Sequence, residues 1–240
     1  MPELRRLGIV AQDPVRLAVF YQEVFDLETI GAENGAVILS DGTFNLALEP
    51  ARAGVDPGLQ YLGFETARVE TIREKIANTD SVQRIKAWPV ADPDIEFEMR
   101  DPDDNIIGLN KRAFDTAYDQ GPAPIRHIAL FTPNPQRLRH FYCDVFGMNE
   151  VQRSDRSSIF VSDGYICLAL LYQKTEEPLG LNHFGFQVKN SEAMRLRAEK
   201  AGVQKGARRP ERIPFAEYRL HDPEGNGIDI SEKGWRVAPQ

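Results

Sequence analysis

The sequence predicts an α+β fold in which two copies of one domain follow each other along the chain. Two observations lead to this prediction. The second half of the chain repeats the first at a nearly constant offset, and within each half a strand, a helix and three strands follow each other twice. The length of 240 residues suits two domains of about 100–150 residues each. Apolar residues make up 42% and charged residues 27% of the chain, which is ordinary for a globular protein.

The repeat keeps its order from one end of each half to the other. Segments rich in identical residues recur at an offset of 121 residues, or of 122 after one inserted residue. The matched pairs are residues 13–25 with 134–146, Asp41-Gly42 with Asp163-Gly164, Gly63-Phe64 with Gly185-Phe186, and Asp101-Pro102 with Asp222-Pro223. This order indicates a duplicated domain. The Pro- and Gly-containing stretch between the copies predicts a linker at residues 115–124, with domains at residues 1–114 and 125–240.

Each copy opens with an apolar strand, at residues 7–10 in the first half and 127–131 in the second. Asp13 and Asn134 follow these strands, and each precedes a proline. An Asp or Asn cap with proline at the first helical position is typical of a helix start. Apolar residues then recur at helical spacing. They are Leu17, Phe20, Tyr21 and Val24 in the first half, and Leu138, Phe141, Tyr142 and Val145 in the second.

Short apolar runs separated by turns follow each helix. The Asp-Gly pairs at residues 41–42 and 163–164 lie between such runs and predict hairpins. The pattern then restarts with strands at residues 61–64 and 183–188, each followed by a second, shorter helix. A last hairpin closes each half around the turns at residues 101–105 and 222–226. The sequence therefore predicts four βαβββ modules, paired two per domain.

Charge and composition exclude several classes of partner. The net charge of −7 argues against binding of nucleic acid, which requires a basic surface. No apolar run approaches the roughly 18–20 residues of a membrane span, and the N-terminus lacks the apolar stretch of a secretory signal. Cys143 and Cys167 lie in apolar segments and are expected to be reduced. We expect a cytoplasmic protein with a small-molecule substrate, and a homodimer as its candidate assembly.

The charge is divided unevenly along the chain. Residues 1–115 carry 12 basic against 21 acidic side chains, a net charge of −9, whereas the remainder carries 17 against 15, a net charge of +2. A solvated acidic face is the simplest interpretation of the first value. The alternative interpretation is that an anionic small molecule binds in the second half.

The order of the modules resembles the vicinal-oxygen-chelate superfamily, which includes glyoxalase I, extradiol dioxygenases and bleomycin resistance proteins. Phe-Tyr in the first helix and Asp-Pro-x-Gly-Asn in the last hairpin carry this resemblance, at residues 141–142 and 222–226 of the second half. It covers nearly the whole chain and concerns the fold rather than one reaction. It implies that each domain forms a curved, half-open sheet around a cleft, and the tandem arrangement is most similar to extradiol dioxygenases.

The resemblance also implies a metal site in the second half. Its ligands would be His127 and His183, each on the first strand of a module, and Asp229, three residues beyond the Asn of the last turn. The matching residues of the first half are Arg6, Tyr61 and Gly108, none of which is a usual ligand. Two neutral imidazoles and a carboxylate suit Fe(II) best, and Mn(II), Zn(II), Ni(II) or Co(II) are also feasible.

The second half departs from the family pattern near this site. The acid is normally Glu, so Glu232 is an alternative to the shorter Asp229. Where extradiol enzymes have a Tyr three residues before the Asp-Pro turn, this chain has Arg219, with Tyr218 beside it. We therefore consider Tyr218, and the titratable His221 near the site, as candidate catalytic residues.

These residues lead to a functional hypothesis with three rivals. We expect a divalent-metal-dependent enzyme that chelates two neighbouring oxygens of a small substrate, with oxygen-dependent C–C or ring cleavage as the favoured reaction. A lyase or isomerase of the glyoxalase type is the first alternative. The second is a metal-free protein that binds and sequesters a small molecule, and the third is a regulatory subunit without activity.

Overall fold

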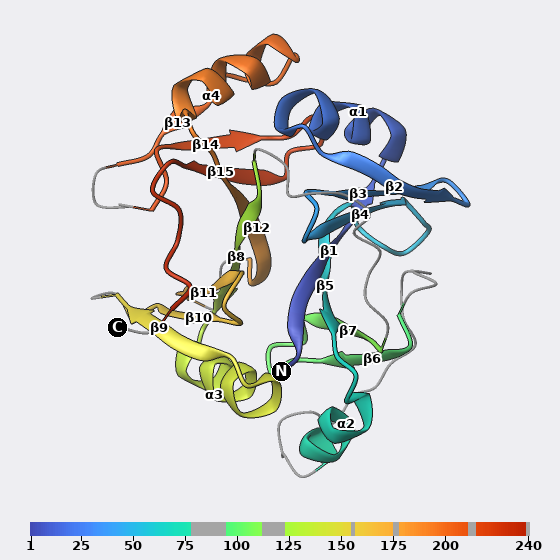
Figure 1. Ribbon diagram of the computed structural model, residues 1–240, viewed down its shortest axis with the longest axis vertical. Coiled ribbons are helices and arrows are strands. Elements are labelled where there is room, and N and C mark those ends of the chain that lie inside the picture. The colour runs from blue at the N-terminus through green and yellow to red at the C-terminus, as the bar shows by residue number, and fades with distance from the viewer. Residues whose placement is uncertain (78–94, 112–122, 155–156, 175–177, 211–214, 239–240) are drawn as a thin grey trace.

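The computed structural model describes residues 1–77, 95–111, 123–154, 157–174, 178–210 and 215–238. Within these ranges each half of the chain forms one open, mixed sheet with two helices (Figure 1). The predicted α+β fold of four modules is therefore confirmed. The linker predicted at residues 115–124 lies mostly outside the described residues, so the domain boundaries at 114 and 125 stay a prediction.

The first half has a seven-stranded sheet with the order β2-β3-β4-β1-β5-β7-β6. Its elements are β1 (Glu3–Ala11), α1 (Pro14–Phe25), β2 (Glu28–Glu33), β3 (Ala36–Ser40), β4 (Asn45–Pro50), β5 (Gly58–Glu65), α2 (Val69–Ala77), β6 (Phe97–Arg100) and β7 (Ile106–Asn110). The two modules meet where β1 pairs with β5 in antiparallel orientation.

The second half has an eight-stranded sheet with the order β13-β14-β15-β12-β8-β11-β10-β9. Its elements are β8 (Ile125–Thr132), α3 (Pro135–Phe146), β9 (Asn149–Arg153), β10 (Ile159–Ser162), β11 (Cys167–Tyr172), β12 (Gly180–Gln187), α4 (Ser191–Lys200), β13 (Ala207–Arg208), β14 (Tyr218–His221) and β15 (Gly227–Ser231). Here β8 pairs with β12, which repeats the junction of the first half. No helix of the described residues is long and apolar enough to cross a membrane.

The first helix of each half begins as the sequence predicts. The Asp13 side chain accepts a hydrogen bond from the backbone N–H of Arg16, and the Asn134 side chain accepts one from that of Arg137. These bonds satisfy N–H groups that have no partner within the helix. α3 ends at Gly147 with φ 73°, a left-handed conformation that glycine adopts without strain.

Each of these helices packs against the other half of the chain. The Phe25 ring of α1 stacks on Phe186 of β12 at 3.9 Å between ring centroids, and Phe146 of α3 stacks on Phe64 of β5 at 4.2 Å. One apolar core therefore runs through both halves. In Figure 1, α1 lies near α4, and α3 near α2.

Hydrogen bonds between the halves repeat in the same way. The Tyr21 hydroxyl donates to Asp222 at 2.7 Å, and the Tyr142 hydroxyl donates to Asp101 at 2.9 Å. All four side chains belong to the two motifs that carry the family resemblance. In each half, the Phe-Tyr helix thus contacts the Asp-Pro turn of the other half.

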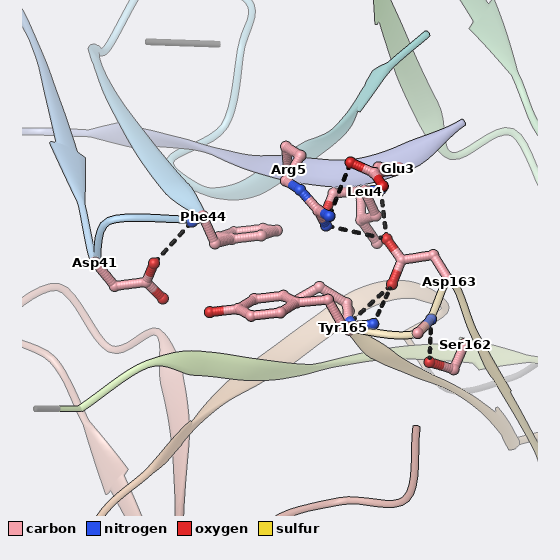
Figure 2. A network of polar contacts seen from close by, with 10 residues as sticks. Glu3, Leu4, Arg5, Asp41, Phe44, Ser162, Asp163 and Tyr165 are labelled. Atoms are coloured by element: carbon pink, nitrogen blue, oxygen red, sulfur yellow. Dashed lines mark hydrogen bonds and ion pairs between the residues drawn. The ribbon is translucent and has the colours of Figure 1, made fainter. Parts of the chain in front are cut away.

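The hairpin aspartates make a second pair of contacts between the halves. Asp163 Oδ2 accepts a hydrogen bond from the backbone N–H of Leu4 at 2.7 Å, as Figure 2 shows, and the Arg5 guanidinium contacts the same oxygen. Asp41 Oδ2 accepts the equivalent bond from the N–H of Ile125 at 2.6 Å. The hairpin of each half therefore holds the first strand of the other.

Candidate metal centre

Three adjacent strands of the second sheet bring His127, His183 and Asp229 together. His127 lies on β8, His183 on β12 and Asp229 on β15, and β12 lies between the other two. Gly185 of β12 is in register with both His127 and Asp229. Because residues in register or two positions apart on a strand share one face of the sheet, the three side chains lie on the same face.

The three side chains are close together and buried. One ligand atom of each lies within 4.8 Å of the others, and His183 Nε2 is 3.3 Å from Asp229 Oδ2. Their exposed fractions are 3%, 4% and 3% for His127, His183 and Asp229. Burial of three ionisable groups is unusual unless they are paired or bind a metal.

Neighbouring groups orient both imidazoles. His127 Nδ1 lies 3.1 Å from the carbonyl oxygen of Cys167, and His183 Nδ1 lies 2.8 Å from Asn182 Oδ1. Since the Cys167 carbonyl is an acceptor, His127 Nδ1 carries the proton and its Nε2 keeps a free lone pair. His183 lies between two acceptors, Asn182 Oδ1 beside Nδ1 and Asp229 Oδ2 beside Nε2. Metal-binding histidines are commonly held in this way.

The electrostatic environment keeps the imidazoles neutral and the carboxyl group ionised. Burial, with the nearby His183, lowers the pKa of His127 to about 3. Burial also lowers the pKa of His183, although Asp229 opposes this effect. For Asp229 burial raises the pKa, but hydrogen bonds from His183 and Arg219 outweigh it and hold the pKa below its ordinary value. Neutral imidazole and carboxylate are the forms that bind metal ions.

Two arginines flank the carboxylate on its other side. Arg219 of β14 donates from Nε to Asp229 Oδ1 at 2.5 Å. Arg209, just after β13, has its Nε 3.8 Å from the same oxygen. Asp229 therefore offers Oδ2 toward His183 and Oδ1 toward the arginines.

The segment after β15 folds back over the site. The Trp235 ring stacks on His127 with 4.7 Å between centroids and 3° between planes. A side chain at position 185 would collide with this ring, since a Cβ there would lie 2.6 Å from a Trp235 carbon atom. Gly185 thus lets the tryptophan close over the imidazole.

Comparison with protein families identifies the region that carries this site. Residues 125–230 match the model of the Glyoxalase/Bleomycin resistance protein/Dioxygenase superfamily.

The match covers the strands that carry all three ligand residues.

Solved structures extend the likeness in fold to both halves of the chain. The Mn(II)-bound glyoxalase from Novosphingobium aromaticivorans is similar over 95% of this chain and 81% of its own, with 19% identity and a TM-score of 0.69. The 2,3-dioxygenase LapB from Pseudomonas sp. KL28 is similar over 99% and 93%, with 17% identity and a TM-score of 0.65. An extradiol ring-cleaving dioxygenase from B. fuscum is similar over 98% and 74%, with 16% identity and a TM-score of 0.67. A comparison with curated proteins found no match. The recognition of a vicinal-oxygen-chelate fold is therefore confirmed.

The structure separates the other sequence candidates from the cluster. The Tyr218 hydroxyl donates to Glu192 of α4 at 2.6 Å, on the face of β14 opposite to Arg219. His221 is exposed at the end of β14. Glu232 accepts hydrogen bonds from the backbone N–H and the hydroxyl of Ser191 at the start of α4, so Asp229 is the carboxylate next to the histidines. Catalytic roles for Tyr218 and His221 stay predictions.

Three site residues were missed by sequence reasoning: Asn182, Arg209 and Trp235. Asn182 directly precedes His183 in the chain, so its side chain could have been predicted to lie beside the imidazole and orient it. Arg209 and Trp235 lie outside the strands that supply the ligands, so no spacing within the motif points to them.

The equivalent region of the first half is filled by side chains. The Tyr61 ring packs so closely over Gly8 that a Cβ at position 8 would lie 1.8 Å from a ring carbon atom. The Tyr61 hydroxyl donates to Glu49 at 3.2 Å. Ile95 covers Gly108, the counterpart of Asp229. In this half the described residues at the three ligand positions offer no imidazole or carboxylate.

Proposed function

We propose that the second half binds one divalent metal ion through His127, His183 and Asp229, and acts on a small molecule with two adjacent oxygen atoms. The observation that supports this most is the convergence of three buried ligand groups, in their metal-binding protonation states, from three adjacent strands. The donor set fits Fe(II) best, with Mn(II), Zn(II), Ni(II) and Co(II) as alternatives. A bound ion would supply Lewis-acid polarisation of the two oxygens.

The residues around the ligands would fix the geometry of the site. The Cys167 carbonyl and the Asn182 side chain hold the imidazoles with Nε2 available. Arg219 holds one oxygen of Asp229, which leaves the other for the metal. Trp235 covers one face of His127 and excludes water from it. Such support commonly changes metal affinity or activity by about 10- to 100-fold.

For the reaction we favour oxygen-dependent cleavage of a C–C bond or ring over a proton shift. Three protein ligands leave up to about three positions of an octahedral ion for substrate and oxygen. A proton shift needs a base near the substrate. Among the described residues the carboxylate of the cluster belongs to Asp229, which as a ligand of the ion would not serve as that base. The ring-cleaving dioxygenases among the similar structures support the same choice.

Metal analysis of the protein tests the first part of the proposal. After expression without added metal, we expect elemental analysis to find about one divalent ion per chain, because the chain offers one set of three ligands. A chain that neither retains nor takes up a divalent ion would contradict the proposal, and would favour a metal-free binding protein.

An oxygen electrode tests the reaction. Protein loaded anaerobically with Fe(II) is mixed with a panel of catechols and enediols, and we expect oxygen uptake that depends on the substrate. The matched control is His127→Ala protein treated in the same way, in which uptake should disappear because one ligand of three is lost. Turnover of an α-oxo thiohemiacetal without oxygen uptake would instead assign the protein to the isomerases.

A further inference from the structure

Arg209 and Arg219 gather at one oxygen of a single carboxylate. Arg219 Nε is 2.5 Å and Arg209 Nε is 3.8 Å from Asp229 Oδ1. The two side chains are exposed by only 24% and 15%, in the order Arg209 and Arg219. Two guanidinium groups therefore share one buried partner, beside the proposed metal ligands.

The hydrogen-bonding capacity of this pair exceeds what Asp229 accepts. A guanidinium group carries five N–H donors. Arg219 Nη2 and Arg209 Nε are both buried and have no hydrogen-bond acceptor within the part of the chain that the structure describes. A buried donor without an acceptor is destabilising by about 1–3 kcal/mol. Two such donors at one place indicate that an acceptor from outside the chain completes the site.

The charge of the site leads to the same conclusion. The two guanidinium groups face one carboxylate, that of Asp229, which leaves one positive charge in excess between these three groups. A divalent ion would raise this to three. Partly buried positive charge of this size is stabilised by an anion.

We propose that Arg209 and Arg219 bind a carboxylate of the substrate, so that the substrate is a small carboxylic acid that also carries the two adjacent oxygens. This inference rests on the proposed function, since it concerns the substrate of the same metal centre. The planar guanidinium fork matches the two oxygens of a carboxylate and forms paired hydrogen bonds with it. The positive net charge of residues 116–240, against the negative charge of the rest, agrees with an anionic substrate.

Two ligands that differ in one group test the proposal. The probes are 3,4-dihydroxybenzoate and 3,4-dihydroxybenzamide, which have the same size and the same adjacent hydroxyls, but only the first carries a carboxylate. Binding to Zn(II)-loaded protein is measured by calorimetry, because zinc supports no redox turnover. We expect the acid to bind about 10- to 100-fold more tightly than the amide, as for a hydrogen bond to a charged group.

Arg209→Gln is the diagnostic variant. Arg209 lies too far from Asp229 to donate a hydrogen bond, so its loss should leave the metal content unchanged and remove most of the preference for the acid. Arg208→Gln is the matched control, because Arg208 is exposed one residue away and the charge change is the same. Arg209→Lys provides a second variant if the first fails to fold. It should retain part of the preference, because the charge stays and the fork is lost.

The outcomes separate this inference from the proposed function. Equal affinity for acid and amide, no binding of either by metal-loaded protein, or a preference that survives in Arg209→Gln would overturn the carboxylate site while the metal centre stands. Failure of the protein to hold zinc or any other divalent ion would overturn the proposed function instead. In that case the metal-free protein is titrated with both probes, and a preference for the acid that Arg209→Gln removes would still support the arginine pair.

Discussion

The two halves of this protein share one fold and one set of mutual contacts, but differ at the face of the sheet where a ligand site would lie. In the second half His127, His183 and Asp229 meet on three adjacent strands. In the first half the matching positions hold Arg6, Tyr61 and Gly108. The strand pairing is the same in both, since β1 pairs with β5 as β8 pairs with β12. The fold therefore supplies the positions, and the side chains decide whether they make a site.

Different side chains cover the matching faces of the two sheets. In the first half the Tyr61 ring fills the space over Gly8, and its hydroxyl reaches Glu49. In the second half the position matching Gly8 is Ala129, and a tryptophan from beyond the last strand lies against His127 instead. A large side chain from within the sheet fills one face, while the other is covered by a residue that lies beyond the last strand.

Loss of a ligand should have the largest effect and should be confined to one half. In His183→Ala we expect the metal complement to fall to near zero, because three ligands become two. The matching change in the first half, Tyr61→Phe, removes only the hydroxyl bonded to Glu49 and should leave the metal complement unchanged. Elemental analysis of both proteins measures this, and a full complement in His183→Ala would mean that the site has other ligands.

The aromatic contacts between the halves should contribute equally to stability. Phe25→Ala and Phe146→Ala each remove a buried ring stacked across the halves, so each should lower the free energy of unfolding by about 3–5 kcal/mol. Urea unfolding followed by circular dichroism gives both values. If the core is shared as described, both variants unfold in a single transition. Two separate transitions would mean that the halves unfold independently.

The paired hydroxyl contacts should have a smaller and again matched effect. Tyr21→Phe and Tyr142→Phe each remove one donor to a buried aspartate, Asp222 or Asp101. We expect a loss of about 1–2 kcal/mol in each, since a charged acceptor loses one of its several donors. The same urea experiment measures it. An effect in only one of the two variants would show that the repeated contacts are not equivalent in strength.

Replacing Trp235 should have the smallest effect on structure, but a clear effect on the fluorescence of the protein. Because its ring stacks on His127, a paramagnetic ion such as Co(II) at the site should quench its fluorescence. In Trp235→Phe the stack is kept and the metal complement should stay unchanged, while the quenching should disappear. Fluorescence titration with Co(II), beside elemental analysis of the same samples, measures both. Unchanged quenching in this variant would assign the signal to another residue.

The sequence predicts the fold well because the signals for it are local and occur twice. The caps at Asp13 and Asn134 and the Asp-Gly hairpins each depend on neighbouring residues, and all are found as expected. The three ligand candidates could be aligned because they lie on regular strands. Arg209 and Trp235 could not be predicted in this way, because they reach the cluster only through the tertiary fold.

The Asp-Pro turns also contact the other half of the chain, which the sequence does not predict. As a local motif it is a turn, and Asp101 and Asp222 indeed bind backbone N–H groups within their own turns. Their second carboxylate oxygens receive tyrosine hydroxyls from the other half. No pattern within one half predicts a partner in the other, since that contact depends on how the two halves meet.

The reciprocal hydrogen bonds of Asp41 and Asp163 bear on how much sequence change the protein tolerates. Each aspartate holds the first strand of the opposite half, so a substitution in one copy weakens the placement of the other copy's sheet. The interface residues of the two copies are thus mutually dependent. The ligand positions differ in this respect, because Tyr61 packs over Gly8 within the first half, whereas His127, His183 and Asp229 lie together within the second. A duplicated chain of this kind can keep its two interfaces alike while the matching faces of its two sheets diverge.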